Sequence, residues 1–190
     1  MPQHYGSPKA PKSNKPLTCE TEAIFSEDGF LVALNEACKN SAPAEIRTQM
    51  MAWLREAQKT GRAKIAEDFL AKPFEARPLT RAYTYLTDHL VCAALHIATT
   101  ILHPNPNPTS GERLSVIAVG GYGRGEMAPS SDVDLLFLTP YKVTSWAESV
   151  IESMLYMLWD LKLKVGHSTR TVQDCVRLGT EDFTVCTAML

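Results

Sequence analysis

Two short apolar runs rich in β-branched residues bracket a glycine-rich stretch, and this arrangement most constrains how the chain can fold. The runs are residues 114–120 and 133–139, and each is typical of a buried β-strand. Between them lie the glycines of the segment 120–125, followed by Asp132 and Asp134. The sequence therefore predicts a strand, a tight glycine turn and a second strand that begins at two carboxylates.

The segments around this unit predict helices and one further strand. Apolar residues recur at helical spacing over residues 44–71, 79–102 and 144–161. Residues 162–171 predict a third strand, and we expect a short helix after it that ends at Gly179. The chain then stops within an apolar helical pattern that has no cap, so we expect it to be truncated at its C-terminus.

Glycine and proline residues predict where the first two helices are interrupted. Gly61 is a weak interruption that costs about 1 kcal/mol relative to alanine. Pro73 and Pro78 are expected to end the first long helix. The turn-rich segment 103–112 separates the helical part from the strands. Asp88 and His89, in the middle of the second helix, suggest catalysis, but a lone histidine with no nearby ligand favours a structural role.

These elements divide the chain into three parts. Residues 1–18 contain four prolines and three lysines and predict a disordered tail. Residues 19–103 predict an N-terminal helical segment. Residues 104–190 predict an α+β domain in which helices pack on a small sheet.

The composition narrows the class of protein. Apolar residues make up 45% of the chain and charged residues 21%, as in a soluble globular protein. The net charge of −2 provides no global basic field for nucleic acid, and we expect neither a membrane span nor a secretory signal. The cysteines are widely spaced and odd in number, which favours reduced thiols in the cytoplasm; they are Cys19, Cys38, Cys92, Cys175 and Cys186.

Two familiar glycine motifs do not fit the segment 120–125. A P-loop requires Lys and Ser or Thr after its last glycine, but Glu126 and Met127 follow Gly125. A dinucleotide-binding fingerprint that starts at Gly121 requires a third glycine where Glu126 stands, and a helix after the turn. The segment must therefore be interpreted on its own chemistry.

The two aspartates predict a metal site. In a strand, residues two apart project from the same face, so Asp132 and Asp134 should point together while Val133 enters the core. Adjacent carboxylates repel each other unless a cation lies between them, and hard oxygen ligands suit Mg²⁺ or Mn²⁺.

The residues before the aspartates predict phosphate binding. Gly120 and Gly121 allow the backbone to approach a ligand and to present N–H groups to phosphate oxygens. Arg124 offers multidentate donors, and Ser131 is placed to donate from the turn before the aspartates. The set suits phosphoryl or nucleotidyl transfer. The alternative is a purely structural role, in which a tight glycine turn is followed by a polar loop that Asp132 caps. This alternative explains the glycines and the aspartates when each is considered separately.

The stretch VGGYGRGEMAPSSDVDLLFL resembles the nucleotidyltransferase domain of the DNA polymerase β superfamily. Together with LTRAYTYLTDHLV upstream and YMLWDLKLKVGHSTRTVQDCVRLGTEDFTVCTAML downstream, it is most similar to the bacterial PII-protein uridylyltransferase family, whose members also remove uridylyl groups. The resemblance covers most of residues 79–190. It implies a polymerase-β-like fold, with a small mixed sheet and packed helices, that binds UTP and Mg²⁺. The implied reaction transfers UMP to a tyrosine of the PII signal protein and releases pyrophosphate.

The resemblance also implies roles for individual residues. Gly120 and Gly121 would hold the triphosphate, Asp132 and Asp134 would ligate two metal ions, and Arg124 and Ser131 would support the phosphates.

One expected ligand is not evident. The superfamily adds a third carboxylate from a later strand, but the strand predicted here has His167 or Arg170 in that region. Asp182 or Asp174 would supply this third carboxylate only if the fold brings it near Asp132 and Asp134, and Asp182 is the preferred candidate for a metal ligand. Its alternative role is helix capping.

Two other functions remain open. Nothing in the loop selects the base, so the chain could belong to another nucleotidyltransferase, for example one that transfers AMP. It could also be a binding module without turnover. Members of the similar family continue into a hydrolase domain and glutamine-sensing domains, which these 190 residues do not include.

Overall fold

Three strands form one mixed sheet, and they are the three that the sequence predicts. The computed structural model describes residues 16–181, 183 and 187. The strands are β1 (Ser115–Ala118), β2 (Val133–Thr139) and β3 (Val165–Thr171), in the order β1-β2-β3. β1 pairs antiparallel with β2, and β2 pairs parallel with β3. Most of the predicted tail, residues 1–15, lies outside the described residues, and so does Asp182.

Helices make up most of the rest of the described chain. The N-terminal segment contains α1 (Thr21–Ile24), α2 (Glu27–Asn40), α3 (Pro43–Ala71) and α4 (Ala76–His96), and a π-helical turn, η1 (Ile97–Leu102), extends α4. A 3-10 turn, η2 (Ser110–Glu112), follows in the connector. The remaining helices are α5 (Gly120–Gly123), α6 (Ser145–Asp160) and α7 (Val172–Glu181). The fold is α+β, as the sequence predicts.

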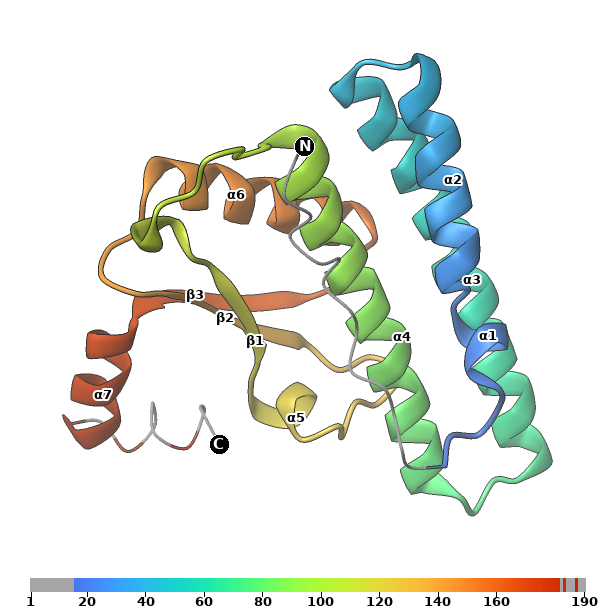
Figure 1. The fold of residues 1–190 in the computed structure, drawn as a ribbon. Helices are drawn as coiled ribbons and strands as arrows, with labels where there is room; N and C mark the ends of the chain where they lie inside the picture. The colour runs from blue at the N-terminus through green and yellow to red at the C-terminus, as the bar shows by residue number, and fades with distance from the viewer. Residues whose placement is uncertain (1–15, 182, 184–186, 188–190) are drawn as a thin grey trace.

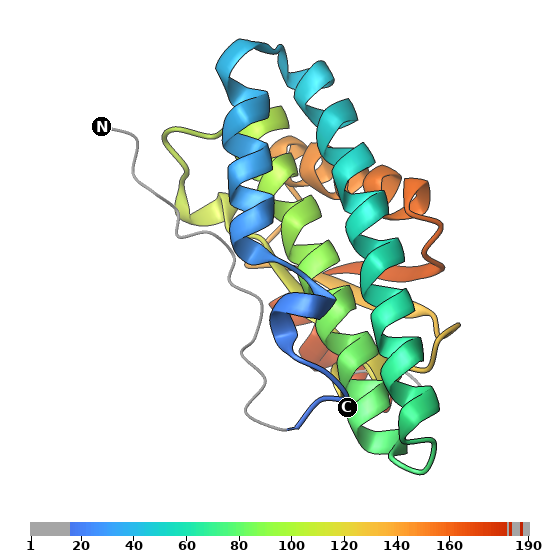
Figure 2. The same cartoon turned by 90° about the vertical axis from the view of Figure 1, so that its right-hand side faces the viewer.

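The elements form layers around α4. This helix lies between the sheet and the pair formed by α2 and α3, and α6 covers the same side of the sheet (Figure 1). Figure 2, turned by 90°, shows α1, α2 and α3 as the outer layer in front of α4. The apolar core is continuous through these layers. The predicted boundary near residue 103 lies between the helices α1–α4 and the part of the chain that contains the sheet, and the core crosses it.

Alternation along β2 decides which face of the sheet is buried. Val133 and Phe137 are fully buried and Leu135 nearly so, and all three share one face. From α6, the predicted apolar stripe meets this core with Met154 and Met157, which are fully buried. Asp134 lies between two of the buried β2 residues in sequence and is therefore carried on the opposite, more open face.

The predicted weak interruption at Gly61 and two predicted helix boundaries are wrong, whereas α3 ends at Ala71, just before Pro73, as expected. Gly61 does not interrupt α3, because it is buried where a Cβ would lie 2.3 Å from the Ile24 carbonyl oxygen, so only glycine allows this close approach. Pro78 lies in the first turn of α4, where its missing N–H has no intrahelical partner in any case. Gly179 does not end α7, which continues to Glu181.

One helical stretch of the described chain, Ala76–Leu102, is long and apolar enough to span a membrane by length and composition. Within its most apolar window 56% is buried inside the fold, because α3 and α6 pack against it and the sheet lies on another side (Figure 1). Burial on several sides accounts for its apolar composition, since a central helix needs little polar surface.

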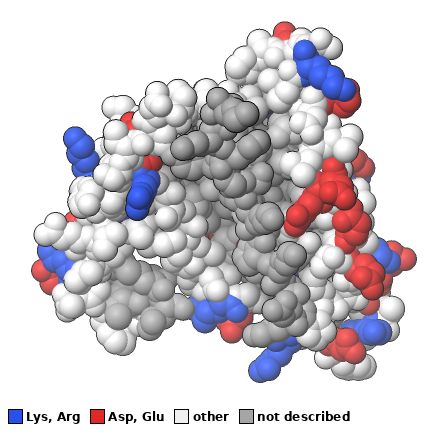
Figure 3. All heavy atoms as spheres, viewed as in Figure 1, with Lys and Arg blue, Asp and Glu red and all other residues white. Residues whose placement is uncertain are grey.

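The charged side chains are unevenly distributed over the face shown in Figure 3. Asp and Glu gather over the region of α1 and α2, whereas Lys and Arg are scattered. On the described part of this face there is no continuous basic stripe of the kind that binds a nucleic-acid backbone.

Candidate active site

The glycine segment forms one helical turn, α5, directly after β1. Sequence analysis predicts a loop here, and the difference follows from the flanking geometry. Gly120 has a φ of +60°, a left-handed conformation that side-chain-bearing residues rarely adopt, and it turns the chain sharply out of the strand. The first N–H groups of such a turn have no partner within it, so they remain available to a ligand.

Asp134 is enclosed between two glycines from different elements. A Cβ on Gly120 would lie 3.3 Å from Asp134 Oδ2, and a Cβ on Gly166 would lie 2.5 Å from Oδ1. Gly166 is the register partner of Asp134 in the parallel pair of β2 and β3. Sequence analysis missed Gly166, although a glycine inside a predicted strand is a signal of close backbone approach.

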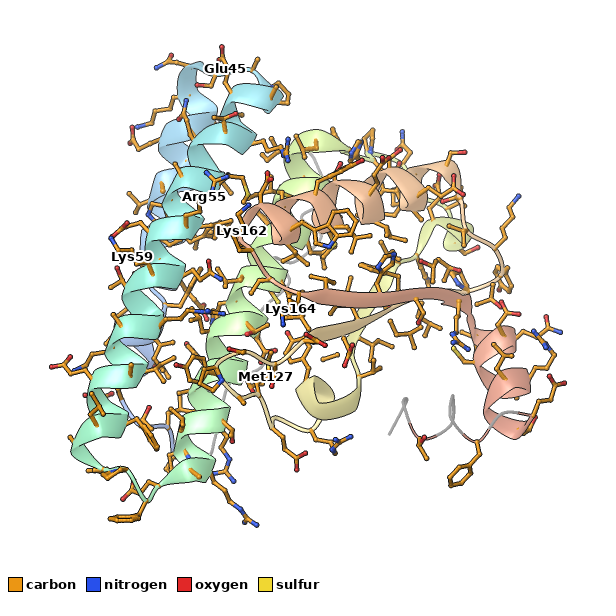
Figure 4. All side chains as sticks on the ribbon, turned by 180° about the vertical axis from the view of Figure 1, so that it is seen from behind. Glu45, Arg55, Lys59, Met127, Lys162 and Lys164 are labelled. Carbon is orange, nitrogen blue, oxygen red and sulfur yellow. The ribbon has the colours of Figure 1, made fainter. Side chains whose placement is uncertain are left out.

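Asp132 lies one residue before β2 and is exposed. Between the two aspartates, Val133 is fully buried, and its N–H donates to the Lys164 carbonyl at 2.7 Å. This bond fixes the start of β2 against the start of β3, where Lys164 is labelled in Figure 4. The predicted burial of Val133 between the two aspartates is confirmed.

Neither aspartate side chain has a hydrogen bond or an ion pair to another residue in the part of the chain that the structure describes. Two carboxylates two residues apart, one exposed and one half-buried and neither with a cationic partner among the described residues, have the donor chemistry that a hard divalent cation requires. The glycines beside Asp134 leave room on both of its oxygens. These residues therefore fit Mg²⁺ or Mn²⁺.

Arg124 and Ser131 flank the aspartates on exposed chain. Arg124 Nε donates to Glu126 Oε2 at 3.0 Å, and both side chains are largely exposed, so this pair contributes little to stability. The Ser131 hydroxyl accepts from the Ala128 N–H at 2.9 Å and keeps its own proton for donation. Both are near the aspartates in sequence, and Glu126 holds the Arg124 guanidinium.

Tyr122 anchors the glycine turn to the core. Its ring is buried and its hydroxyl donates to Asp88 Oδ1 on α4 at 2.8 Å. Burial, opposed by the Tyr122 hydrogen bond and His89, raises the pKa of Asp88 to about 6. Burial and the neighbouring Asp88 raise the pKa of Tyr122 well above its usual value. Met127 lies between the loop and α4 and is also buried (Figure 4).

His89 has a structural role, as the sequence favours. Its Nδ1 lies 2.7 Å from the Tyr85 carbonyl oxygen and its Nε2 lies 2.9 Å from Glu27 Oε1. The side chain is almost fully buried and joins α4 to α2. Its neighbour Asp88, by contrast, points to the glycine turn, which sequence analysis did not predict because the two are 34 residues apart.

No described residue adds a third metal ligand to Asp132 and Asp134. His167 is on the face of β3 opposite Gly166, and its ring centroid lies 6.4 Å from that of Phe137, away from Asp134. Asp174 caps α7 by accepting from the N–H and hydroxyl of Thr171, which holds the pKa of Asp174 below its usual value. Among the described residues no group of three metal-ligating side chains occurs. The prediction for Asp182 lies outside the described residues.

A family model for glutamate-ammonia ligase adenylyltransferase matches residues 19–158 of this chain. The match begins in the helical segment and includes the glycine turn, both aspartates and most of α6.

The chain belongs to this family.

Curated relatives carry a different nucleotide in their names. The chain is 63% identical over 171 residues to a bifunctional uridylyltransferase/uridylyl-removing enzyme of Ruegeria pomeroyi, which covers 90% of this chain. It is 62% and 45% identical to enzymes of the same name from Cereibacter sphaeroides and Erythrobacter litoralis, over 78% and 84% of the chain. It spans between 16% and 18% of the length of these relatives. No solved structure matches the chain.

The family match and the relatives agree on the reaction class. Both names describe nucleotidyltransferases, so the resemblance stated from the sequence is confirmed at that level.

The four described cysteines, Cys19, Cys38, Cys92 and Cys175, are free thiols, and Cys186 lies outside the described residues.

Proposed function

We propose that this chain forms the nucleotide-binding part of a metal-dependent uridylyltransferase that acts on a protein. The reaction transfers UMP from UTP to a tyrosine hydroxyl of the PII signal protein in the cytoplasm. The tyrosine oxygen forms a bond to the α-phosphorus, the bond between the α- and β-phosphates breaks, and pyrophosphate leaves while the hydroxyl proton is lost. The observation that carries the proposal is the pair Asp132 and Asp134, which have no partners among the described residues, with Asp134 held beside Gly120 and Gly166.

The chain's own residues divide the work of binding. Asp132 and Asp134 would hold Mg²⁺ or Mn²⁺, with Asp182 as the candidate for a third ligand. Bound divalent cations would supply charge neutralisation to the triphosphate and the leaving pyrophosphate. The backbone at Gly120 and Gly121 approaches the phosphates, because no side chain blocks it.

Two exposed groups orient the phosphates. Arg124 exchanges its weak contact with Glu126 for a phosphate, to which a guanidinium binds with two parallel hydrogen bonds. Ser131 donates its free hydroxyl proton. Positioning of this kind, rather than covalent participation by the protein, accounts for most of the rate enhancement in phosphoryl transfer.

A second candidate is adenylyl transfer, which the description of the matching family model favours. No described residue of the turn distinguishes uracil from adenine. The two candidates share the metal site and the phosphate contacts and differ in the nucleotide and the acceptor. The choice of UTP is supported by the names of the curated relatives.

Label transfer tests both candidates. The protein is incubated with Mg²⁺ and purified PII protein, and with either α-³²P-UTP or α-³²P-ATP. We expect label on PII from UTP alone. Asp132→Asn and Asp134→Asn should each reduce transfer by about 100-fold or more, since each removes a charged ligand. Asp160→Asn removes a carboxylate at the end of α6, remote in sequence from the site, and serves as the control; the ion pair with Arg47 that it breaks is exposed and contributes little to stability.

The outcomes separate the alternatives. Label from ATP alone would replace UTP with the second candidate. Metal-dependent nucleotide binding without transfer to PII would indicate a binding module. Transfer that persists in the Asp132→Asn/Asp134→Asn double variant would contradict the metal site.

A further inference from the structure

The glycine turn contains one residue with a side chain, and that side chain is buried. Gly120, Gly121 and Gly123 give the turn more backbone freedom than any other residue type would, so ordering it costs more conformational entropy. Tyr122 offsets this cost because its ring is 4% exposed and packs in the core. The conformation of the turn therefore depends on where Tyr122 is held.

Tyr122 is held by a residue from a distant part of the chain. Its hydroxyl donates to Asp88 Oδ1 at 2.8 Å, and α4 carries Asp88 into the core beside the turn. The titratable groups around this pair are His89 and Cys92 on α4 and Glu27 on α2. Burial, then Asp88, raises the pKa of the Cys92 thiol to about 11, so the thiol stays neutral.

The same turn is in contact with the candidate metal ligand. Gly120 lies against Asp134, whose Oδ2 would be 3.3 Å from a Cβ at residue 120. The Val119 N–H also donates to the Asp134 carbonyl at 3.1 Å. A displacement of Tyr122 would therefore move both the backbone that faces the phosphates and the residue that limits the position of the Asp134 carboxylate.

We propose that Asp88 is a positioning residue for the nucleotide site, and that it acts through the Tyr122 hydroxyl to hold the turn Gly120–Gly123 in its binding conformation. This inference rests on the proposed nucleotidyl transfer. Asp88 does not touch the substrate. It organises the turn before the nucleotide arrives, which lowers the entropy lost on binding.

Four variants test this role. Tyr122→Phe removes only the hydroxyl and keeps the ring in the core. Asp88→Ala removes the acceptor, and Asp88→Asn keeps an acceptor oxygen. Tyr83→Phe is the matched control, because Tyr83 is also a buried tyrosine, on α4 itself, and has no hydrogen bond from its hydroxyl to a described residue.

The first measurement is amide hydrogen exchange of a peptide covering residues 119–126, without nucleotide. We expect faster exchange in Tyr122→Phe and Asp88→Ala and wild-type exchange in Asp88→Asn and Tyr83→Phe. Unchanged exchange in Tyr122→Phe would overturn the inference. Because this measurement needs no substrate, it remains informative even if the protein transfers no nucleotide and the proposed function fails.

The second measurement is the KM for the nucleotide in the transfer assay. Tyr122→Phe and Asp88→Ala should each raise KM about tenfold, and the double variant should raise it no further, because both remove one interaction. Asp88→Asn and Tyr83→Phe should stay within about twofold of wild type. A KM that is unchanged in Tyr122→Phe, or additive effects of the two substitutions, would reduce the contact to general stabilisation and overturn the positioning role.

Discussion

Gly166 lies directly opposite Asp134 in the parallel strand pair, and a Cβ on residue 166 would be only 2.5 Å from Asp134 Oδ1. Real Cβ contacts are not this short, so the Asp134 carboxylate can occupy its observed position only if residue 166 has no side chain. The carboxylate therefore depends on the absence of one side chain on a neighbouring strand. The first prediction follows from this contact.

Gly166→Ala should displace the Asp134 carboxylate. The backbone of residue 166 is not left-handed, so the cost arises from the contact itself. We expect nucleotidyl transfer to fall about 10- to 100-fold and the free energy of unfolding to fall by about 1–3 kcal/mol. Denaturant unfolding and the transfer assay measure the two effects.

The control for Gly166→Ala is a double-mutant cycle. In an Asp134→Ala background the Cβ meets no carboxylate, so the stability cost of Gly166→Ala should largely vanish. An equal cost in both backgrounds would mean that the strand, rather than Asp134, rejects the methyl group. Gly111→Ala is a second control, because a Cβ there would lie at an ordinary 3.6 Å from the Thr109 side chain.

Gly61→Ala should destabilise the fold although it improves helix propensity. Alanine gains about 1 kcal/mol over glycine in a helix interior. At Gly61, however, the Cβ would lie 2.3 Å from the Ile24 carbonyl oxygen, so α1 must move away from α3. We expect a net loss of about 1–3 kcal/mol in the free energy of unfolding.

Gly179→Ala is the matched helical glycine for this test. A Cβ on Gly179 in α7 meets nothing within 4 Å, so alanine there should be neutral or stabilising by up to about 1 kcal/mol. If both substitutions raised the melting temperature alike, the close packing of α1 on Gly61 would be wrong.

Asp88→Asn should change the pH dependence of stability. The pKa of Asp88 is about 6 in the folded protein and near 3.8 when exposed, so the folded state binds more protons between these values. Stability from this group is present below about pH 4 and is lost as pH rises to about 6. The shift corresponds to about 3 kcal/mol.

The comparison requires unfolding free energies of both proteins from pH 4 to pH 8. Other carboxylates titrate equally in the two, so their difference isolates Asp88. Relative to wild type, Asp88→Asn should become progressively more stable as pH rises through this range and then level off. A difference that stays constant with pH would show that Asp88 titrates at its ordinary value.

Asp132→Asn and Asp134→Asn should not weaken the fold without metal. Neither carboxylate has a hydrogen-bonding or ionic partner among the described residues, so we expect changes within about 0.5 kcal/mol in EDTA. With Mg²⁺ and UTP at about 100 times the dissociation constant, the wild-type protein should gain about 2.7 kcal/mol and the variants much less. Thermal unfolding in both buffers measures this, and equal gains would place the metal and nucleotide elsewhere.

The sequence by itself determined the local features of the site. Strand alternation predicts the burial of Val133 between Asp132 and Asp134, and β2 has the predicted bounds of residues 133–139. These features depend on residues that are close in sequence, whose relative orientation follows from the period of a strand. For the same reason the helical periodicity located α3, α4 and α6.

Only the tertiary structure decided which distant residues meet the turn and the aspartates. Gly166 reaches Asp134 through parallel pairing across α6, and Asp88 reaches Tyr122 through the packing of α4 on the turn. Position 61, inside a helix, requires glycine because α1 approaches it too closely for a side chain. Periodicity describes how one element presents its faces, whereas these contacts depend on how elements pack against one another, and that is set by the shape of the whole core.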